Sequence, residues 1–309
     1  MEENLADLRA QLAANQRGAT ELLGFVSANG IAALRDAMSG LTARAQRISR
    51  QILVRLAARG SQFHAEERLD DGSPIRVSIQ VASGSAVIDF ADSGDTHPRN
   101  LNATGAIIRS AVMYVLRLMS PEPLPLNEGL LAPVELRIPR GMLNPHFESE
   151  PESCPAVAGG NVETSQRVVD TLLKAMNLCA CSQGTMNNTT FGNSTFGYYE
   201  TVCGGAGAGP GFHGASAIHT HMTNTRITDP EVLEHRYPVR LRRFTVRHGS
   251  GGPGRYRGGD GVIRELEFLK PCTLSILTQH RATGPFGGAG GEPGARGSQI
   301  VVRNDGTVE

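Results

Sequence analysis

Apolar side chains recur every three or four positions over the first part of the chain. Between residues 31 and 56 the spacings of three and four alternate, which is the heptad-like pattern of a helix with one apolar stripe. A shorter stripe of leucines precedes it over residues 5–22. Asn29 and Gly30 separate the two stripes, and glycine is a poor helix former. Residues 2–57 are therefore predicted to form two helices joined as an N-terminal helical hairpin.

The apolar pattern changes to period two after residue 75. Val77, Ile79 and Val81 alternate with other residues, and Ser83-Gly84 marks a turn before an apolar return strand that ends at residue 90. Further elements are predicted as helices over 102–119, 161–178 and 229–235, and as strands over 134–138, 240–246, 262–268 and 274–278. The fold class predicted is α+β, with helices packed around mixed β-sheets and long glycine-rich loops. Two lobes, 1–150 and 151–309, are expected within one domain.

A long segment from residue 182 to residue 226 has a different composition. It is rich in Gly, Asn, Thr and Ser and has too few large apolar residues for a core of its own. Such a segment is expected to form loops and short strands on a scaffold, which is where binding and catalytic residues usually lie. Two more glycine-rich loops are expected near residues 249–261 and 284–297.

Composition excludes several classes of protein. The chain has 309 residues, with 30 basic and 30 acidic side chains, so its net charge of zero gives no attraction to nucleic acid. No apolar run reaches the length of about 20 residues that a membrane helix needs. The first residues are acidic and polar, unlike a secretory signal, and the five cysteines show no CxxC pair. We expect a cytoplasmic protein with neither membrane nor nucleic acid as partner.

The sequence lacks the phosphate-loop motif GxxxxGK[ST]. Both lysines, Lys174 and Lys270, follow a leucine, so neither completes the motif. The run Gly204–Gly209 offers backbone N–H groups that wrap anions in other proteins, but no clear strand and helix flank it. On spacing alone, a tight structural loop is the favoured interpretation of this run.

Histidines and amides are concentrated in the polar segment. If residues 219–221 form a strand, His219 and His221 lie on one face, where two imidazoles can share a metal with Glu200 and His213. A hydrogen-bonded pair of histidines is the favoured alternative. Cys179 and Cys181 have no neighbouring base in the sequence, so a nucleophilic thiolate is not expected.

Several long strings of the sequence resemble one family. They include ENLADLRAQLAANQRG, GGNVETSQRVVD, SQGTMNN, YYETVCGGAGAG, HTHMTNTRITDPEVLEHRYPV and YRGGDGVIRE, and the resemblance runs from Glu3 to about Gly297. On these strings the chain resembles the hydantoinase B/oxoprolinase family, and within it the ATP-hydrolysing oxoprolinase branch.

The resemblance implies a reaction and its partners. It implies hydrolysis of the lactam of 5-oxo-L-proline to L-glutamate, coupled to hydrolysis of ATP. ATP and Mg would be handled by a hydantoinase A-like part or subunit, and any divalent metal would have its ligands mostly upstream of ENLADLRAQ. The chain is then expected to be the C-terminal part of a larger, homo-oligomeric enzyme and to be inactive alone.

The resemblance also raises particular residues to site candidates. Those expected to be catalytic are His219, His221, Glu200 and Asn224. Those expected to bind substrate are Arg226, Asn161, Asn187, Asn188, Gly205 and Gly207, with Arg226 facing the substrate carboxylate. Two other functions stay open: the B-type component of a hydantoinase or related carboxylase, and a non-catalytic remnant or interaction subunit.

Overall fold

The computed structural model describes residues 2–123, 126–303 and 305–308. Its elements, in chain order, are α1 (Glu2–Ala57), β1 (Gln62–Arg68), β2 (Pro74–Ala82), β3 (Ser85–Asp89), α2 (Gly105–Leu118), β4 (Val134–Arg137), α3 (Ser165–Ala175), β5 (Asn188–Gly192), β6 (Gly197–Thr201), α4 (Pro230–Arg236), β7 (Val239–Arg247), β8 (Gly261–Phe268) and β9 (Thr273–Leu277). Helices packed on mixed sheets confirm the predicted α+β class.

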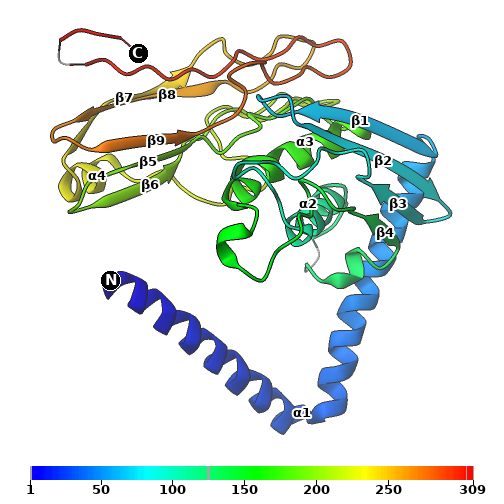
Figure 1. Cartoon of the computed structure of the whole chain (residues 1–309). Coiled ribbons are helices and arrows are strands. Elements are labelled where there is room, and N and C mark those ends of the chain that lie inside the picture. Colours follow the sequence, from blue (N-terminus) through cyan, green and yellow to red (C-terminus); the bar gives the residue numbers. More distant parts are fainter. Residues whose placement is uncertain (1, 124–125, 304, 309) are drawn as a thin grey trace.

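The long helix α1 breaks at the predicted position. Gly30 has φ 83° and ψ 156°, outside helical values, and separates two helical arms that diverge as a V (Figure 1). The hairpin is therefore open. Leucines of the first arm stay exposed, whereas Ile48, Ile52 and Leu56 near the end of the second arm are buried against the first sheet. Only the part of the heptad stripe that reaches the body of the molecule is used for packing.

The main core lies between the first sheet and three helices. The sheet has the order β1-β2-β3-β4, antiparallel except for the parallel pair β3 and β4. The end of α1, the apolar face of α2 and the apolar residues of α3 join the same core. The sequence pattern correctly predicts β2, β3 and their turn, but it misses β1, whose sequence QFHAEER has little apolar character.

The second half of the chain builds two smaller sheets. One has the order β6-β5-β9 and the other pairs β7 with β8, and both are antiparallel. A small aromatic core around Phe191 and Tyr198 joins them to α4. Long loops run beside these sheets (Figure 1), as the composition of residues 182–226 and 284–297 predicts. The division into lobes at residue 150 stays a prediction, and α3 packs on the core of the first sheet.

Among the residues that the structure describes, no helix is both long enough and apolar enough to cross a membrane.

Candidate functional site

A close approach of two backbone segments brings polar residues into the interior. The N–H of Gly159 donates to the carbonyl of Asn100 at 2.7 Å. A Cβ atom on Gly160 would lie 2.0 Å from the carbonyl oxygen of Asn102, so only glycine fits there. The chain then makes a π-helical turn over residues 160–164 and continues as α3. Turns of this kind are frequent at functional sites.

The N-terminal part of α3 is buried although it is polar. Its side chains without exposure to solvent include Glu163 in the π turn, followed by Gln166, Arg167 and Asp170. Burial of such groups is costly unless each is paired, so their partners indicate what the site is built to hold.

Asp170 has several hydrogen-bond partners. Its carboxylate accepts from the backbone N–H of Ser182 at 3.0 Å, from the Ser182 hydroxyl at 3.1 Å and from His221 Nε2 at 3.2 Å. Burial opposes ionisation of this carboxyl, but the hydrogen bonds from His221 and from the Ser182 amide hold its pKa below the ordinary value. Asp170 is thus a buried carboxylate anion.

The anion fixes the orientation of His221. In the tautomer that donates from Nε2 to Asp170, Nδ1 of His221 is left to accept from the Tyr114 hydroxyl, 3.2 Å away. Burial raises the pKa of Tyr114 to about 12, so this hydroxyl keeps its proton. The three side chains form a continuous hydrogen-bond chain from α3 to α2, which we call the Asp170 chain (Asp170, His221 and Tyr114).

A second histidine lies on the other side of Asp170. His280 Nδ1 donates to the carbonyl of Thr283 at 2.9 Å, and its Nε2 is 3.6 Å from Cys181 Sγ. Burial lowers the pKa of His280 to about 4, so the ring stays neutral. Burial also raises the pKa of Cys181 well above its ordinary value, which keeps the thiol protonated. The structure thus supports the expectation that Cys181 is no thiolate nucleophile.

Arg167 leaves donors unused in this polar centre. Its Nη1 lies 3.6 Å from Glu67 Oε2, while Nε and Nη2 have no hydrogen-bond partner among the described residues. A buried guanidinium with free N–H groups is unfavourable unless water or a ligand completes it.

Glu163 differs from Asp170 in its protonation state. Its Oε1 accepts from Asn188 Nδ2 at 3.4 Å, and Asn188 in turn accepts from the Tyr199 hydroxyl at 2.5 Å. Burial is the largest influence on Glu163 and raises its pKa to about 8, against Thr185, the Met186 amide and two arginines that lower it. At neutral pH this carboxyl is largely protonated.

The raised pKa of Glu163 predicts a pH-dependent stability. Between the ordinary pKa of about 4.5 and the folded value of about 8, the folded state binds more protons than the unfolded state. Stability should therefore fall as pH rises through this window, by at most about 1.4 kcal/mol per pH unit. Glu163→Gln removes the titration, so its melting temperature should exceed that of the wild type at pH 9 and approach it near pH 5.

Thermal denaturation followed by circular dichroism between pH 5 and pH 9 measures this difference. Glu265→Gln is the matched control, because Glu265 is an exposed carboxylate on β8. The titration of Glu163 is contradicted as a cause if the melting temperatures of both variants depend on pH in the same way as that of the wild type.

A second polar cluster lies between the two smaller sheets. Glu200 on β6 binds Arg264 on β8 in bidentate fashion, at 2.6 Å to Nε and 3.0 Å to Nη2, and both side chains are buried. The Tyr198 hydroxyl donates to Glu200 at 2.8 Å, and the guanidinium of Arg264 lies 5.3 Å from the ring centre of Phe244. Arg264 Nη1 has no hydrogen-bond partner within the described ranges.

Both clusters border one large cleft. Its volume is about 1930 Å³, and its walls include Glu200 and Arg264 from the second cluster and Cys181, Ser182 and His280 from the first. Glycine-rich segments form much of the remaining wall, including residues 250–254 and 287–291. The cleft is therefore the place where a small polar molecule can meet both clusters.

The structure separates the two predicted histidines. Residues 219–221 form a loop, and His221 has φ +52°, so the strand that would place both rings on one face is not formed. His221 joins Asp170. His219 lies near the charge of Glu200, burial lowers its pKa, and neither ring nitrogen has a hydrogen-bond partner among the described residues.

The predicted amides and arginine divide into two groups. Asn188 lies beside Glu163, and Asn187 lines the cleft, where its Oδ1 accepts from Arg281 at 2.9 Å. The other predicted residues of this kind do not lie beside them and are exposed: Asn161, Asn224 and Arg226.

Gly205 and Gly207 serve close packing of the loop. A Cβ atom on Gly205 would lie 2.0 Å from the carbonyl oxygen of Gly259, and one on Gly207 would lie 1.9 Å from that of Ala180. Gly205 also lines the cleft. This geometry supports the structural-loop interpretation of the run, although a role in substrate binding stays a prediction.

Several polar residues of the centre escaped the sequence analysis. Glu163, Arg167 and Asp170 recur at spacings of four and three, which places them on one face of a helix. That spacing was the signal available for them. His280 carries no local signal, because only the fold brings it to the cleft.

The described residues offer no group of three or more His, Cys, Asp and Glu side chains arranged to hold a metal. The expectation that any divalent metal takes its ligands mostly from elsewhere in the enzyme stays a prediction.

The comparisons with known proteins define the class. The profile of the family Hydantoinase B/oxoprolinase matches residues 1–309. The chain belongs to this family, as its sequence strings indicate.

Individual relatives within the family show different degrees of identity to this chain. The chain is 44% identical to 5-oxoprolinase 1 of Arabidopsis thaliana and 42% identical to 5-oxoprolinase of Saccharomyces cerevisiae, matching over 99% and 98% of its length. It spans about a quarter of the length of each of these relatives, 25% in both cases. Identity to the putative B component of a D-/L-hydantoinase from a Pseudomonas species is lower, at 26% over 97% of this chain and 54% of that protein.

Solved structures confirm the fold. An ATP-dependent caprolactamase from Pseudomonas jessenii superimposes with a TM-score of 0.74 at 25% identity, covering 87% of this chain and 49% of that one. Acetone carboxylase in a nucleotide-free form has a TM-score of 0.70 at 17% identity, covering 89% of this chain and 41% of that one.

The ATP dependence of such relatives raises the question of whether this chain fits a nucleotide. The glycine run 204–209 is packed against other backbone at Gly205 and Gly207, and no lysine follows it as in a phosphate loop. Lys174 is engaged by the Glu66 carbonyl at 3.0 Å and by the Glu67 carboxylate. The residues present do not fit an ATP phosphate site of the loop type.

Proposed function

We propose that this chain is the C-terminal part of an ATP-dependent 5-oxoprolinase, a hydrolase that opens the cyclic amide of 5-oxo-L-proline to L-glutamate. The observation that carries the proposal is the 44% identity to a 5-oxoprolinase over 99% of the chain. The relation to an ATP-dependent caprolactamase, whose name also denotes a cyclic amide, supports the same type of reaction.

The cleft has the chemistry that such a substrate needs. 5-Oxoproline carries a carboxylate and an amide, so its recognition calls for a cation and for hydrogen-bond donors and acceptors. Arg264 offers an unused N–H, and Gln183 offers a buried Oε1 without a hydrogen-bond partner in the described part of the chain. We assign these two groups to substrate binding, together with Asn187 and Asn188.

The Asp170 chain has a positioning role in this proposal. The Asp170 anion fixes the tautomer of His221, and His221 fixes the Tyr114 hydroxyl. A histidine held in this way can pass a proton during opening of the amide and return to its starting state. Glu200, which lines the cleft, and His219, which lies near its charge, are proposed to act together. Asn224 and Arg226 would act only where another part of the enzyme covers their exposed surface.

The remaining parts of the reaction are assigned to other parts of the enzyme. We propose that ATP and Mg are bound by a hydantoinase A-like part or subunit, that the complete enzyme is a homo-oligomer, and that the chain alone does not turn over 5-oxoproline. The packed glycine run supports this division of labour. A cytoplasmic location stays a prediction from the sequence.

The test measures glutamate formation from 5-oxo-L-proline with and without ATP. The natural protein, purified with any partner subunit, and the isolated 309-residue chain are compared, with hydantoin and caprolactam as competing substrates. We expect ATP-dependent glutamate formation by the natural protein only. Preference for hydantoin would instead favour the hydantoinase B function, and failure with every cyclic amide would favour a non-catalytic role. Glutamate formation by the isolated chain would contradict the assignment of ATP to another part.

A further inference from the structure

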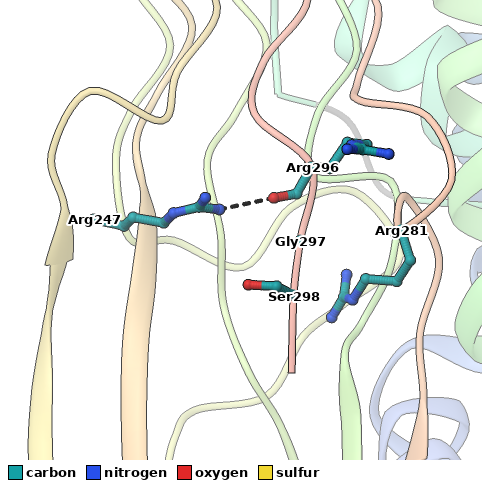
Figure 2. Close-up of a pocket in the computed structure, with 5 residues that line it drawn as sticks. All are labelled: Arg247, Arg281, Arg296, Gly297 and Ser298. Atoms are coloured by element: carbon teal, nitrogen blue, oxygen red, sulfur yellow. Dashed lines mark hydrogen bonds between the residues drawn. The ribbon is translucent and has the colours of Figure 1, made fainter. Parts of the chain in front are cut away.

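Three arginines surround a small pocket beside the cleft. Its volume is about 450 Å³, and it is lined by Arg247, Arg281, Arg296, Gly297 and Ser298. Arg247 from the end of β7 and Arg281 from the segment after β9 approach residues 296–298 from opposite sides (Figure 2). Every lining residue except Arg296 also lines the large cleft, so the pocket opens into it.

The guanidinium groups are held by neutral acceptors. Arg247 Nη1 donates to the carbonyl of Arg296 at 2.9 Å, and Arg296 Nη1 donates to that of Ala282 at 3.3 Å. Arg281 donates to the Gln279 carbonyl at 2.8 Å and to side-chain amide oxygens. These bonds fix the positions of three cations without cancelling their charge.

The pocket lacks a matching negative charge. Within the described ranges, no carboxylate oxygen lies within 4.0 Å of a side-chain nitrogen of these three arginines, whereas Arg264 and Arg76 each have such a partner. Glu163 and Asp70 act on Arg281 only from a greater distance, and the raised pKa of Glu163 leaves it largely neutral at pH 7. The guanidinium groups of Arg247 and Arg281 both approach residues 296–298 (Figure 2), and two such cations without a counter-charge repel each other unless an anion joins them.

Because Gly297 has no side chain, the backbone at this position can pass close to the guanidinium of Arg281. A Cβ atom at this position would lie 2.0 Å from Arg281 Nη1, so a side chain here would displace the guanidinium from its place in the pocket. The Ser298 hydroxyl adds a neutral donor on the same wall. Convergent guanidinium groups with a hydroxyl are the donor set that binds the oxygens of phosphate or carboxylate.

We propose that the pocket of Arg247, Arg281 and Arg296 is a binding site for an oxyanion, either a phosphate or the carboxylate of a small molecule that extends into the cleft. The site is separate from the Asp170 chain and from the Glu200–Arg264 pair. It does not depend on the proposed function, because binding is measured without turnover.

The experiment titrates the 309-residue chain with inorganic phosphate in one arm and with 5-oxo-L-proline and L-glutamate in the other, by isothermal calorimetry at pH 7 and low salt. Saturable binding in the first arm identifies phosphate as the ligand class, and saturable binding in the second identifies a carboxylate. Arg247→Ala should weaken the binding about tenfold, equivalent to about 1.4 kcal/mol. Added salt should weaken it as well, because the pocket is partly open to solvent.

Two further variants separate charge from geometry. Gly297→Ala keeps the net charge but moves Arg281, and it should also weaken binding about tenfold. Arg17→Ala removes an equal charge from the exposed first arm of α1 and should leave binding unchanged. Circular dichroism and melting curves establish that each variant is folded. The proposal is overturned if the folded wild type binds neither anion, or if Arg247→Ala and Gly297→Ala bind as tightly as Arg17→Ala.

Discussion

An Arg264→Ala protein is expected to lose about 3–5 kcal/mol of unfolding free energy, enough to unfold a domain of ordinary stability. The physical reason is that removal of this guanidinium leaves Glu200 as a buried carboxylate without its cation. Both side chains are almost inaccessible to solvent, at 5% and 3% exposure, so water cannot replace the lost partner. The Tyr198 hydroxyl remains as a donor to Glu200 but carries no charge.

Urea denaturation followed by circular dichroism measures this loss. Arg243→Ala on β7 is the matched control, because its partner Glu265 is exposed and such pairs contribute at most about 1 kcal/mol. A double variant, Glu200→Gln with Arg264→Gln, removes both charges and should recover part of the stability. A small loss in Arg264→Ala, similar to that of Arg243→Ala, would show that Glu200 is solvated in the protein.

An Asp170→Asn enzyme is expected to lose a factor of about 10² to 10⁴ in kcat, the range contributed by a positioned acid–base group. The asparagine keeps the size of the side chain but can present an N–H₂ group to His221 Nε2. The proton of His221 would then move to Nδ1, which faces the Tyr114 hydroxyl, and the direction of the whole hydrogen-bond chain would reverse.

The measurement is ATP-dependent 5-oxoproline hydrolysis by the natural protein as a function of pH. A positioning role predicts a lower kcat and a changed pH profile with little change in KM. Asp92→Asn is the matched control, because Asp92 is exposed in the turn after β3. A variant that keeps the wild-type kcat and pH profile would remove the Asp170 chain from the reaction, while loss of folding in Asp170→Asn would be visible in its melting curve. His221→Gln, tested in parallel, alters the same hydrogen-bond chain but keeps the Asp170 carboxylate.

The sequence pattern predicts local structure well where apolar residues mark a buried face. The strands at 74–82 and 85–89, the helix from Gly105 and the break at Gly30 all follow from spacing and from glycine. The strand β1 escapes such prediction because its residues are partly exposed and polar, and it is stabilised by pairing with β2 rather than by its own pattern.

The candidate site could be predicted only in part, for the same reason. The polar segment from residue 182 is visible in the composition, and Glu200, His221, Asn187 and Asn188 all lie at or beside the cleft or the buried centre. The spacing of His219 and His221 could not decide between a strand and a loop, and the positive φ at His221 lies in a loop where His221 meets Asp170 and His219 does not.

By itself the sequence determines the α+β class, the family and the region of the chain that carries polar chemistry, because these depend on local periodicity, composition and ordered strings of residues. Tertiary structure alone decides which charges meet. Asp170 and His221 are 51 residues apart, and Glu200 and Arg264 are 64 apart. Their pairing and burial, and the approach of Arg247 and Arg281 to residues 296–298, arise from the packing of separate elements, which no local spacing encodes.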